Sequence, residues 1–416
     1  MTEDARPKPL AGKTVIDLTT ALAGPYATLL LAGLGARVIK VENPLTGGDT
    51  SRNNAPYLGR DGLRLSRAHD DDMSVSMLLR GRNKESVTLN LKEPEAHAVF
   101  LDLVSHADVV VENFSAGVTA RLGIDYPALR ERNPKLVYTS ISGFGAQGGP
   151  GSGKAMDTII QALSGLMMTA GEAGDSPVRN GLPVGDLVAP LFAVVGTLAA
   201  VIQAETTGAG QHVDVSMLGA LTSLVACEPF DAYAAVGLKQ RTGAMVPRLA
   251  PFGLFEAKDG WFALCGPTDA FAGGVFRAMG RPELGEDERF RTRDARVSNS
   301  DKLHASIGAW ASGLSKADAV DALAREGVPA AEVREPVDAV RDPLTLSRRE
   351  VVPLTHGRYG PTADITGTGL PISFSGSDTG FDRAAPELGE HNELVYGGLL
   401  GYSGERIAAL GDGGVL

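Results

Sequence analysis

The sequence predicts an α/β protein whose larger domain contains a Rossmann-like parallel sheet. Short β-branched runs recur, helical patterns separate them, and the runs are apolar nearly throughout. Strands of this kind are typical of parallel sheets that helices cover on both faces. The first five runs are TVIDLT, RVIKVE, SVTLNL, ADVVVENF and LVYTSIS, which begin at Thr14, Arg37, Ser86, Ala107 and Leu136.

Helical patterns connect these runs. The segment AGPYATLLLAGLGA, between the first two runs, predicts an apolar helix that ends near Gly35. A longer uncharged stretch, from Leu187 to Ala204, approaches the roughly 20 residues that a membrane span requires. It contains Pro190 and Gln203, so we predict a buried helix rather than a span. A glycine-containing turn, an alternating strand in QHVDVSM and the apolar helix LGALTSLVA follow it.

The elements become shorter from about Glu228 onward. The strand GWFALCG begins at Gly260, and amphipathic pieces such as KADAVDALAREG follow it. A final helical pattern, YSGERIAALGDGG, comes after Pro-rich and Gly-rich segments and is expected to return to the first domain. We therefore predict that 1–227 forms the N-terminal part of a large domain, that 228–330 forms a small α+β domain, and that 331–416 is a linker with a C-terminal return.

Composition disfavours several classes of partner. Lys and Arg total 39 against 50 Asp and Glu, and this net charge of -11 argues against nucleic acid, whose ligands are normally basic. The two cysteines, Cys227 and Cys265, cannot form a disulfide framework, and the N-terminus MTEDARPKPL has no apolar signal core. The seven histidines show no metal-ligand spacing. We expect a cytoplasmic protein with no metal site and no nucleic-acid or membrane partner.

Two glycine-rich segments resemble nucleotide-binding motifs, but each departs from its motif. GGPGSGKA follows a strand and ends in Ala155, where a phosphate-binding loop needs a hydroxyl for Mg²⁺. GLGARVIKVE suggests a dinucleotide fold, yet the first strand-to-helix turn, TTALAGP, lacks the G-x-G-x-x-G pattern. A nucleoside triphosphatase and an NAD-dependent oxidoreductase are therefore both disfavoured. Lys154 and its glycine-rich turn still suit some other phosphate group.

One acid, Asp186 in PVGDLVAP, stands directly before the long apolar stretch. Asp is a frequent helix N-cap, a role worth about 1 kcal/mol. A carboxylate at the edge of apolar packing is also a candidate nucleophile, because a helix N-terminus keeps it ionised while burial leaves it poorly solvated. The stretch alone favours the cap, and both roles are compatible in geometry.

Six motifs resemble, in order, those of the class III CoA-transferases, and the likeness resumes near the C-terminus in PISFSG and LGEHNELVYGGLLGYS. The resemblance implies an enzyme that transfers CoA from an acyl-CoA to a carboxylic acid, through covalent intermediates on Asp186. It implies CoA as a substrate, no permanently bound cofactor, and two chains interlocked as a homodimer. The motifs are VIDLTTALAGPYATLLLAGLGARVIKVENPLTGGDTSR, GRNKESVTLNLKEPEA, ADVVVENFSAG with RLGIDY, LVYTSISGFGAQGGP, GLPVGDLVAP and TGAGQHVDVSM.

The same resemblance assigns further site residues. Asp157 is implied as a supporting carboxylate, although an N-cap of its own helix is an equally good interpretation. Cations suit the phosphates of CoA, and an amide and an aromatic face suit its adenine or pantetheine arm. Among them, Asn113 and Phe114 follow a strand end, where ligands of α/β folds usually lie. The implied CoA contacts are Ala23, Lys92, Asn113, Phe114, Arg121 and Lys154.

Two alternatives remain open at this point. The sequence also resembles the α-methylacyl-CoA racemases of the same superfamily, but Met156 stands where they carry a catalytic histidine, and methionine cannot exchange a proton. A non-catalytic CoA-binding protein is the second alternative, against which the acid at Asp186 argues. Leu22 and Asn43 replace residues typical of the formyl-CoA branch, so the acyl group stays open.

Overall fold

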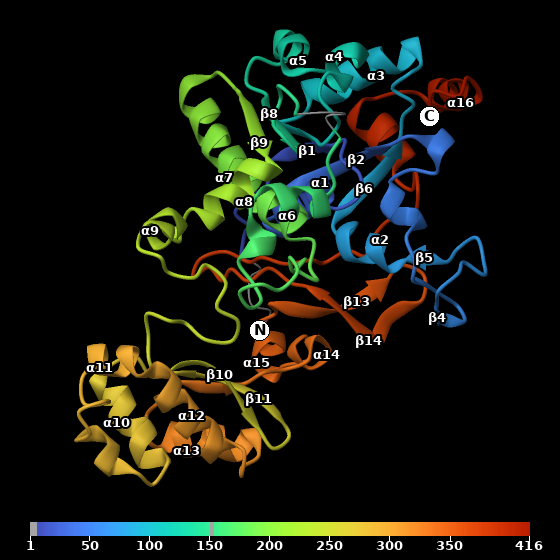
Figure 1. The fold of residues 1–416 in the computed structure, drawn as a ribbon. Coiled ribbons are helices and arrows are strands. Elements are labelled where there is room, and N and C mark those ends of the chain that lie inside the picture. Colours follow the sequence, from blue (N-terminus) through green and yellow to red (C-terminus); the bar gives the residue numbers. More distant parts are fainter. Residues whose placement is uncertain (1–5, 150–153) are drawn as a thin grey trace. The chain divides into compact units, whose positions relative to one another are not determined.

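The computed structural model describes residues 6–149 and 154–416, which form two compact units (Figure 1). The first unit comprises the chain up to Leu166, together with Arg179–Cys227 and Val340–Leu416. The second unit comprises Met167–Val178 and Glu228–Ala339. This division does not decide the domain boundaries expected from the sequence, which stay a prediction.

A six-stranded sheet lies at the centre of the first unit, and all of its neighbouring strands are parallel. The predicted α/β class with a parallel sheet is thus confirmed. The chain adds strands outward on one side of β1 and then crosses to the other side with β7, so these two strands are neighbours at the reversal. Ligands of such sheets bind at the carboxyl ends of the two strands at the reversal. The sheet order is β6 (Lys84–Thr88), β2 (Arg37–Glu42), β1 (Thr14–Asp17), β7 (Val109–Glu112), β8 (Val137–Ser142) and β9 (His212–Ser216).

Helices cover both faces of this sheet (Figure 1). Successive strand residues point to opposite faces, so Val15 packs in one core cluster and Ile16 in the other. The first cluster includes α1 (Ala23–Gly33), α6 (Asp157–Leu163), α7 (Val184–Thr207) and α8 (Met217–Val225). The second includes α3 (Pro94–Ser105), α5 (Tyr126–Arg132), the π-helix η5 (Glu393–Leu399) and α16 (Gly404–Asp412). The C-terminal residues therefore complete the core that the N-terminal strands begin.

Helix α7 has one buried and one exposed apolar face. Among the described residues it is the helix long and apolar enough to cross a membrane, a test that core helices of soluble proteins also pass. Ala189 and Ala193 are buried, whereas Val195 and Ile202 are 66% and 65% exposed. The prediction of a buried helix therefore holds for one face only.

Shorter elements complete the first unit. Small antiparallel sheets join β3 to β4 and β5, and β13 to β14; the β13–β14 hairpin interrupts the segment for which the sequence predicted only a linker. The elements are η1 (Pro44–Thr46), η2 (Thr50–Asn53), β3 (Tyr57–Gly59), β4 (Gly62–Arg64), β5 (Met73–Ser74), α2 (Val75–Arg80), α4 (Val118–Leu122), η3 (Leu166–Met168, which runs into the second unit), α15 (Pro343–Ser347), β13 (Val351–His356) and β14 (Gly360–Thr368).

The second unit is α+β in composition. A three-stranded antiparallel sheet packs with helices around its own apolar core, in which Phe255, Phe262 and Phe276 are buried. Its elements are α9 (Phe230–Ala235), β10 (Phe252–Ala257), β11 (Gly260–Cys265), α10 (Asp269–Ala278), η4 (Pro282–Gly285), α11 (Arg293–Ser298), α12 (Ser300–Ala311), α13 (Lys316–Arg325), β12 (Ala330–Glu332) and α14 (Pro336–Ala339).

Candidate active site

A cavity of about 400 Å³ lies where the loops after β1 and β7 meet the start of α7. This is the position that the strand order predicts for a ligand. Every residue that lines the cavity belongs to the first unit. We call it the Asp186 cavity; its lining residues are 21–23, 113–116, 141–145, 148, 155–158, 179, 183, 186 and 217.

Asp186 is the third residue of α7, in the first turn of the helix. Pro183 occupies the N-cap position and makes no side-chain cap hydrogen bond of its own, so the interpretation of Asp186 as the cap is wrong. The carboxylate is half-buried and lines the cavity. Within the described part of the chain it accepts no hydrogen bond. A helix N-terminus favours a negative charge at this position, and both oxygens of the Asp186 carboxylate are left available to a ligand.

The surroundings of Asp186 make its carboxylate more basic than usual. Burial, and to a smaller extent the nearby charge of Asp157, raise the pKa of Asp186 to about 6, while the Arg80 guanidinium acts in the opposite direction. A carboxylate with this pKa is mostly ionised at neutral pH. Because it is poorly solvated, it is also a better nucleophile than a carboxylate in water.

Asp157 holds the first turn of α7 in place beside Asp186. It is 9% exposed and is the first residue of α6, so Met156 rather than Asp157 occupies the N-cap of that helix. One carboxylate oxygen of Asp157 accepts from the Gly185 N–H at 2.8 Å, and the other accepts from Gln161 Nε2 at 2.7 Å. The N–H of Gly185 is one of those that a helix start leaves unpaired. Asp157 thus caps the following helix, α7, and not its own.

The loop between β1 and α1 forms one wall of the cavity, and hydrogen bonds to Asn113, Asp49 and Arg80 hold it in place. Asn113 pairs with the backbone of Thr20 through both atoms of its amide, at 2.9 and 2.8 Å. Ala21 has a positive φ of 69°, its N–H donates to Asp49 at 2.9 Å, and its carbonyl accepts from Arg80 at 2.9 Å. A non-glycine residue in this conformation is strained and persists only when its surroundings hold it there. Such strain is concentrated at functional sites.

The structure brings some of the expected site residues together and leaves others apart. Ala23, Asn113, Phe114, Asp157 and Asp186 all line the cavity. The residues Lys92, Arg121 and Lys154 are exposed and do not line it, although Lys154 directly precedes the lining residue Ala155. Both polar atoms of the Asn113 amide already form hydrogen bonds with the Thr20 backbone. The roles of all these residues toward CoA stay predictions.

Two cations near Asp186 were not predicted. Arg179 lines the cavity and is exposed, and its Nη1 donates to the Asn180 carbonyl at 2.8 Å. Arg80 ends α2 and lies close enough for its charge to affect the pKa of Asp186. Arg179 stands seven positions before Asp186 in the sequence, which is only a weak indication that it belongs to the site. Arg80 is far from Asp186 in the sequence, and nothing in its own segment indicates a role there.

Across 6–149 and 154–416 no cluster of His, Cys, Asp and Glu side chains is arranged to hold a metal ion.

Comparisons with known proteins identify the family of this chain. The family described as CoA-transferase family III matches residues 10–392. An acetyl-CoA:oxalate CoA-transferase of Acetobacter aceti is 36% identical over 95% of this chain and 97% of its own. A succinate–glutarate CoA-transferase of Agrobacterium fabrum is 34% identical over 94% and 95%. The crystal structure of a CAIB/BAIF family protein from Brucella suis superposes with a TM-score of 0.80 at 32% identity, over 95% of this chain and all of that one. The chain therefore belongs to CoA-transferase family III and is a CoA-transferase.

Proposed function

We propose that this enzyme moves CoA from an acyl-CoA thioester to a carboxylic acid through covalent intermediates on Asp186. The observation that carries the proposal is the Asp186 carboxylate itself. It lines a cavity at the carboxyl ends of β1 and β7, and within the described residues it has no hydrogen-bond donor. Asp186 is half-buried and faces the cavity, so its carboxylate is available to a ligand.

The chemistry proceeds by exchange of acyl bonds. A carboxylate oxygen of Asp186 attacks the thioester carbonyl carbon, and the C–S bond breaks to give a mixed anhydride and CoA thiolate. The thiolate then attacks the aspartyl carbonyl carbon, which leaves an aspartyl-CoA thioester and releases the donor acid. The acceptor carboxylate attacks this thioester and forms a second anhydride and thiolate. The thiolate attacks the acceptor carbonyl, which releases the new acyl-CoA and restores the Asp186 carboxylate. No net proton or electron is exchanged.

The neighbours of Asp186 support this role. Asp157 holds the N–H of Gly185, so the first turn of α7 keeps one position while intermediates form and break. The charge of Asp157 also raises the pKa of Asp186, which strengthens the nucleophile. Arg80 supplies the opposing positive charge that keeps the acid ionised near neutral pH.

Trapping with hydroxylamine tests the proposal. The enzyme is mixed briefly with a panel of acyl-CoAs and quenched with hydroxylamine, and the peptide that contains Asp186 is analysed by mass. We expect a hydroxamate at Asp186 with a productive donor, and none in Asp186→Ala. If no donor labels Asp186 and the substrate α-proton exchanges with D₂O instead, the racemase alternative replaces the transferase. Met156 argues against that outcome, because it stands where the racemases have their histidine.

The acid limb of the pH profile should report Asp186. A nucleophilic carboxylate must be ionised, so kcat/KM is expected to fall as pH drops through about 6. Asp157→Asn removes a like charge while an amide oxygen remains to accept from Gly185, so the limb should move to lower pH. Glu205→Gln makes the same charge change at the exposed far end of α7 and should leave the limb in place. A limb that does not move in Asp157→Asn would show that Asp157 does not tune the nucleophile.

We propose small dicarboxylic acids as the substrate class. The two relatives above are named for oxalate and for succinate and glutarate, which are all dicarboxylates. Arg179 lines the same cavity as Asp186 and suits the second carboxylate of such an acid. Steady-state transfer with matched acceptors tests this assignment: kcat/KM should be higher for a dicarboxylate than for the monocarboxylate of equal chain length. Equal values for the two would contradict it.

We also propose that the enzyme acts in the cytoplasm as a homodimer and holds CoA only during turnover. The exposed apolar residues of α7 support the dimer, because exposed apolar surface on one helix commonly marks an interface between chains. These residues include Leu191, Phe192, Val195 and Ile202. Light scattering after size exclusion tests it, since a monomer at micromolar concentration would contradict a dimer.

A further inference from the structure

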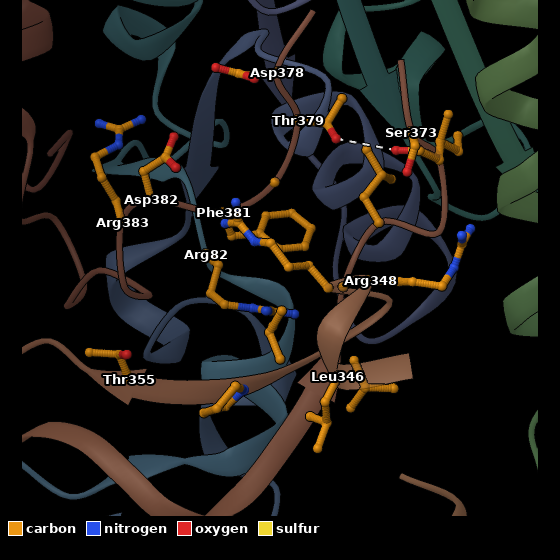
Figure 2. A pocket seen from close by; sticks show the side chains of 18 of the residues that line it. Arg82, Leu346, Arg348, Thr355, Ser373, Asp378, Thr379, Phe381, Asp382 and Arg383 are labelled. Carbon is orange, nitrogen blue, oxygen red and sulfur yellow. Dashed lines mark hydrogen bonds between the residues drawn. The ribbon is translucent and has the colours of Figure 1, made fainter. Parts of the chain in front are cut away.

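A second cavity, of about 520 Å³, lies elsewhere in the first unit and shares no lining residue with the Asp186 cavity (Figure 2). Strand β13, the segment that follows β14 and the side chain of Arg82 enclose it. We call it the arginine cavity, because four of its lining residues are arginines: Arg82, Arg348, Arg349 and Arg383.

Arg82 is a buried cation without a carboxylate partner. Arg82 is 4% exposed, and its guanidinium carbon lies over the Phe381 ring, 4.3 Å from the ring centre. Both side chains are labelled in Figure 2. Nε and Nη2 donate to the Leu79 carbonyl at 3.1 and 3.0 Å, and Nη2 also donates to the Thr368 carbonyl at 2.8 Å. Nη1 has no partner among the described atoms. Burial alone lowers the pKa of Arg82 to about 10, so no nearby carboxylate offsets the cost of burying its charge.

Arg349 adds a second cation to the same cavity. It has a positive φ of 58°, and its guanidinium lies against Gly380, where an added Cβ would be 3.4 Å from Nη2. Within the described part of the chain it has no ion pair, and a strained backbone at such a position needs support from its surroundings. Arg348 and Arg383, in contrast, already have carboxylate partners, Glu350 and Glu85.

The acids of the arginine cavity are engaged with other groups. Asp382 forms an ion pair with Lys8, and Asp378 accepts from the Arg6 backbone N–H at 3.1 Å. They therefore do not neutralise Arg82 or Arg349. The hydroxyl of Ser373 also lines the cavity and adds a donor for an oxygen ligand, whereas the Thr379 hydroxyl already donates to the Ile372 carbonyl at 3.3 Å (Figure 2).

We propose that the arginine cavity binds a small oxyanion, the phosphate or carboxylate group of a metabolite, between Arg349 and the Arg82–Phe381 stack. Arg349 donates directly to the anion. Arg82 contributes the charge of a buried guanidinium, which water screens less than the charge of an exposed one. The site is separate from the Asp186 cavity, so the proposal does not depend on the reaction assigned there.

Isothermal titration of the full-length protein at constant ionic strength tests this site, with inorganic phosphate and succinate as probes and chloride as the reference. Arg349→Gln should weaken binding of the preferred probe by about 10-fold or more, the cost of losing a charged hydrogen bond. Arg325→Gln removes the same charge from an exposed position on α13 and should bind as the wild type does. Arg82→Lys should also weaken binding; if that variant does not fold, Arg349→Gln still decides the question.

Three results would overturn the proposal. Binding that is unchanged in Arg349→Gln and is displaced by CoA would place the anion in the Asp186 cavity. The absence of binding of either probe to the wild type at millimolar concentration would show that the cavity holds no small anion. A change in oligomeric state of Arg349→Gln, with no response of the wild type to either probe, would identify the cavity as a contact between subunits.

Discussion

Replacing Asp186 with alanine is expected to lower kcat for CoA transfer by at least about 10⁴-fold, since removal of a covalent nucleophile typically costs this much or more. No other carboxylate can take over the reaction, because Asp157, which also lines the cavity, is committed to Gly185 and Gln161. The measurement is steady-state transfer followed by separation of the acyl-CoA products. Residual activity above about one hundredth of the wild-type rate would exclude Asp186 as the nucleophile.

Asp186→Asn separates loss of chemistry from loss of structure. The raised pKa means that the folded protein disfavours the charged acid, so the wild type loses stability as pH rises from about 4 to about 6. Asparagine carries no charge, so the variant should be more stable than the wild type by roughly 1–2 kcal/mol at about pH 8, with the gain vanishing below about pH 4. Thermal unfolding at both pH values measures this difference. Glu205→Gln, at the exposed end of the same helix, should keep both activity and stability.

The sheet could be predicted from the sequence because its signals are local. A β-branched run such as RVIKVE at Arg37 indicates a strand and its length without reference to the rest of the chain, and β2 covers that run in full. The strand in SVTLNL begins two residues earlier than expected, at Lys84, because Lys84 and Glu85 also pair with β2. The buried charge of Lys84 is matched by Asp17. The hairpin of β13 and β14 was not predicted, since its two strands contain two prolines and two glycines, which are unfavourable inside strands.

The site could be predicted only in part because its contacts are distant in sequence. The acid at Asp186 and the loop residues Asn113 and Phe114 follow from motifs and strand ends. The hydrogen bond from Gly185 to Asp157 joins residues 28 positions apart, so local spacing suggested a cap for the wrong helix. Arg80 reaches the site only because α2 lies beside the β1–α1 loop, and no property of its own segment indicates that.

A buried ionic network lies behind the wall of the Asp186 cavity. Asp17, at the end of β1, is fully buried and accepts from Lys84 Nζ at 2.9 Å. Lys84 also donates to the Pro25 carbonyl at 3.0 Å, and Lys40 donates to the Thr19 carbonyl at 2.8 Å. These bonds hold both ends of the loop that carries the strained residue 21 and the lining residues 22 and 23. The network therefore links the stability of the sheet to the shape of the cavity.

Asp17→Ala is expected to destabilise the protein by about 3–5 kcal/mol, because it leaves Lys84 with an uncompensated buried charge. Glu205→Ala, which removes one partner of an exposed ion pair, should cost no more than about 1 kcal/mol. Chemical denaturation followed by circular dichroism compares the two variants. If Asp17→Ala lowers the free energy of unfolding no more than Glu205→Ala does, the Asp17 carboxylate does not stabilise the fold by compensating the charge of Lys84.

The double variant Asp17→Val Lys84→Met decides whether the network serves the fold or the site. Apolar replacement of a buried ion pair is often neutral or stabilising, so the double variant should recover much of the stability that Asp17→Ala loses. It cannot restore the hydrogen bond from Lys84 to the Pro25 carbonyl, so the cavity wall should stay loose. We therefore expect normal unfolding together with a raised KM for acyl-CoA. Recovery of both stability and KM would mean that packing alone positions the loop.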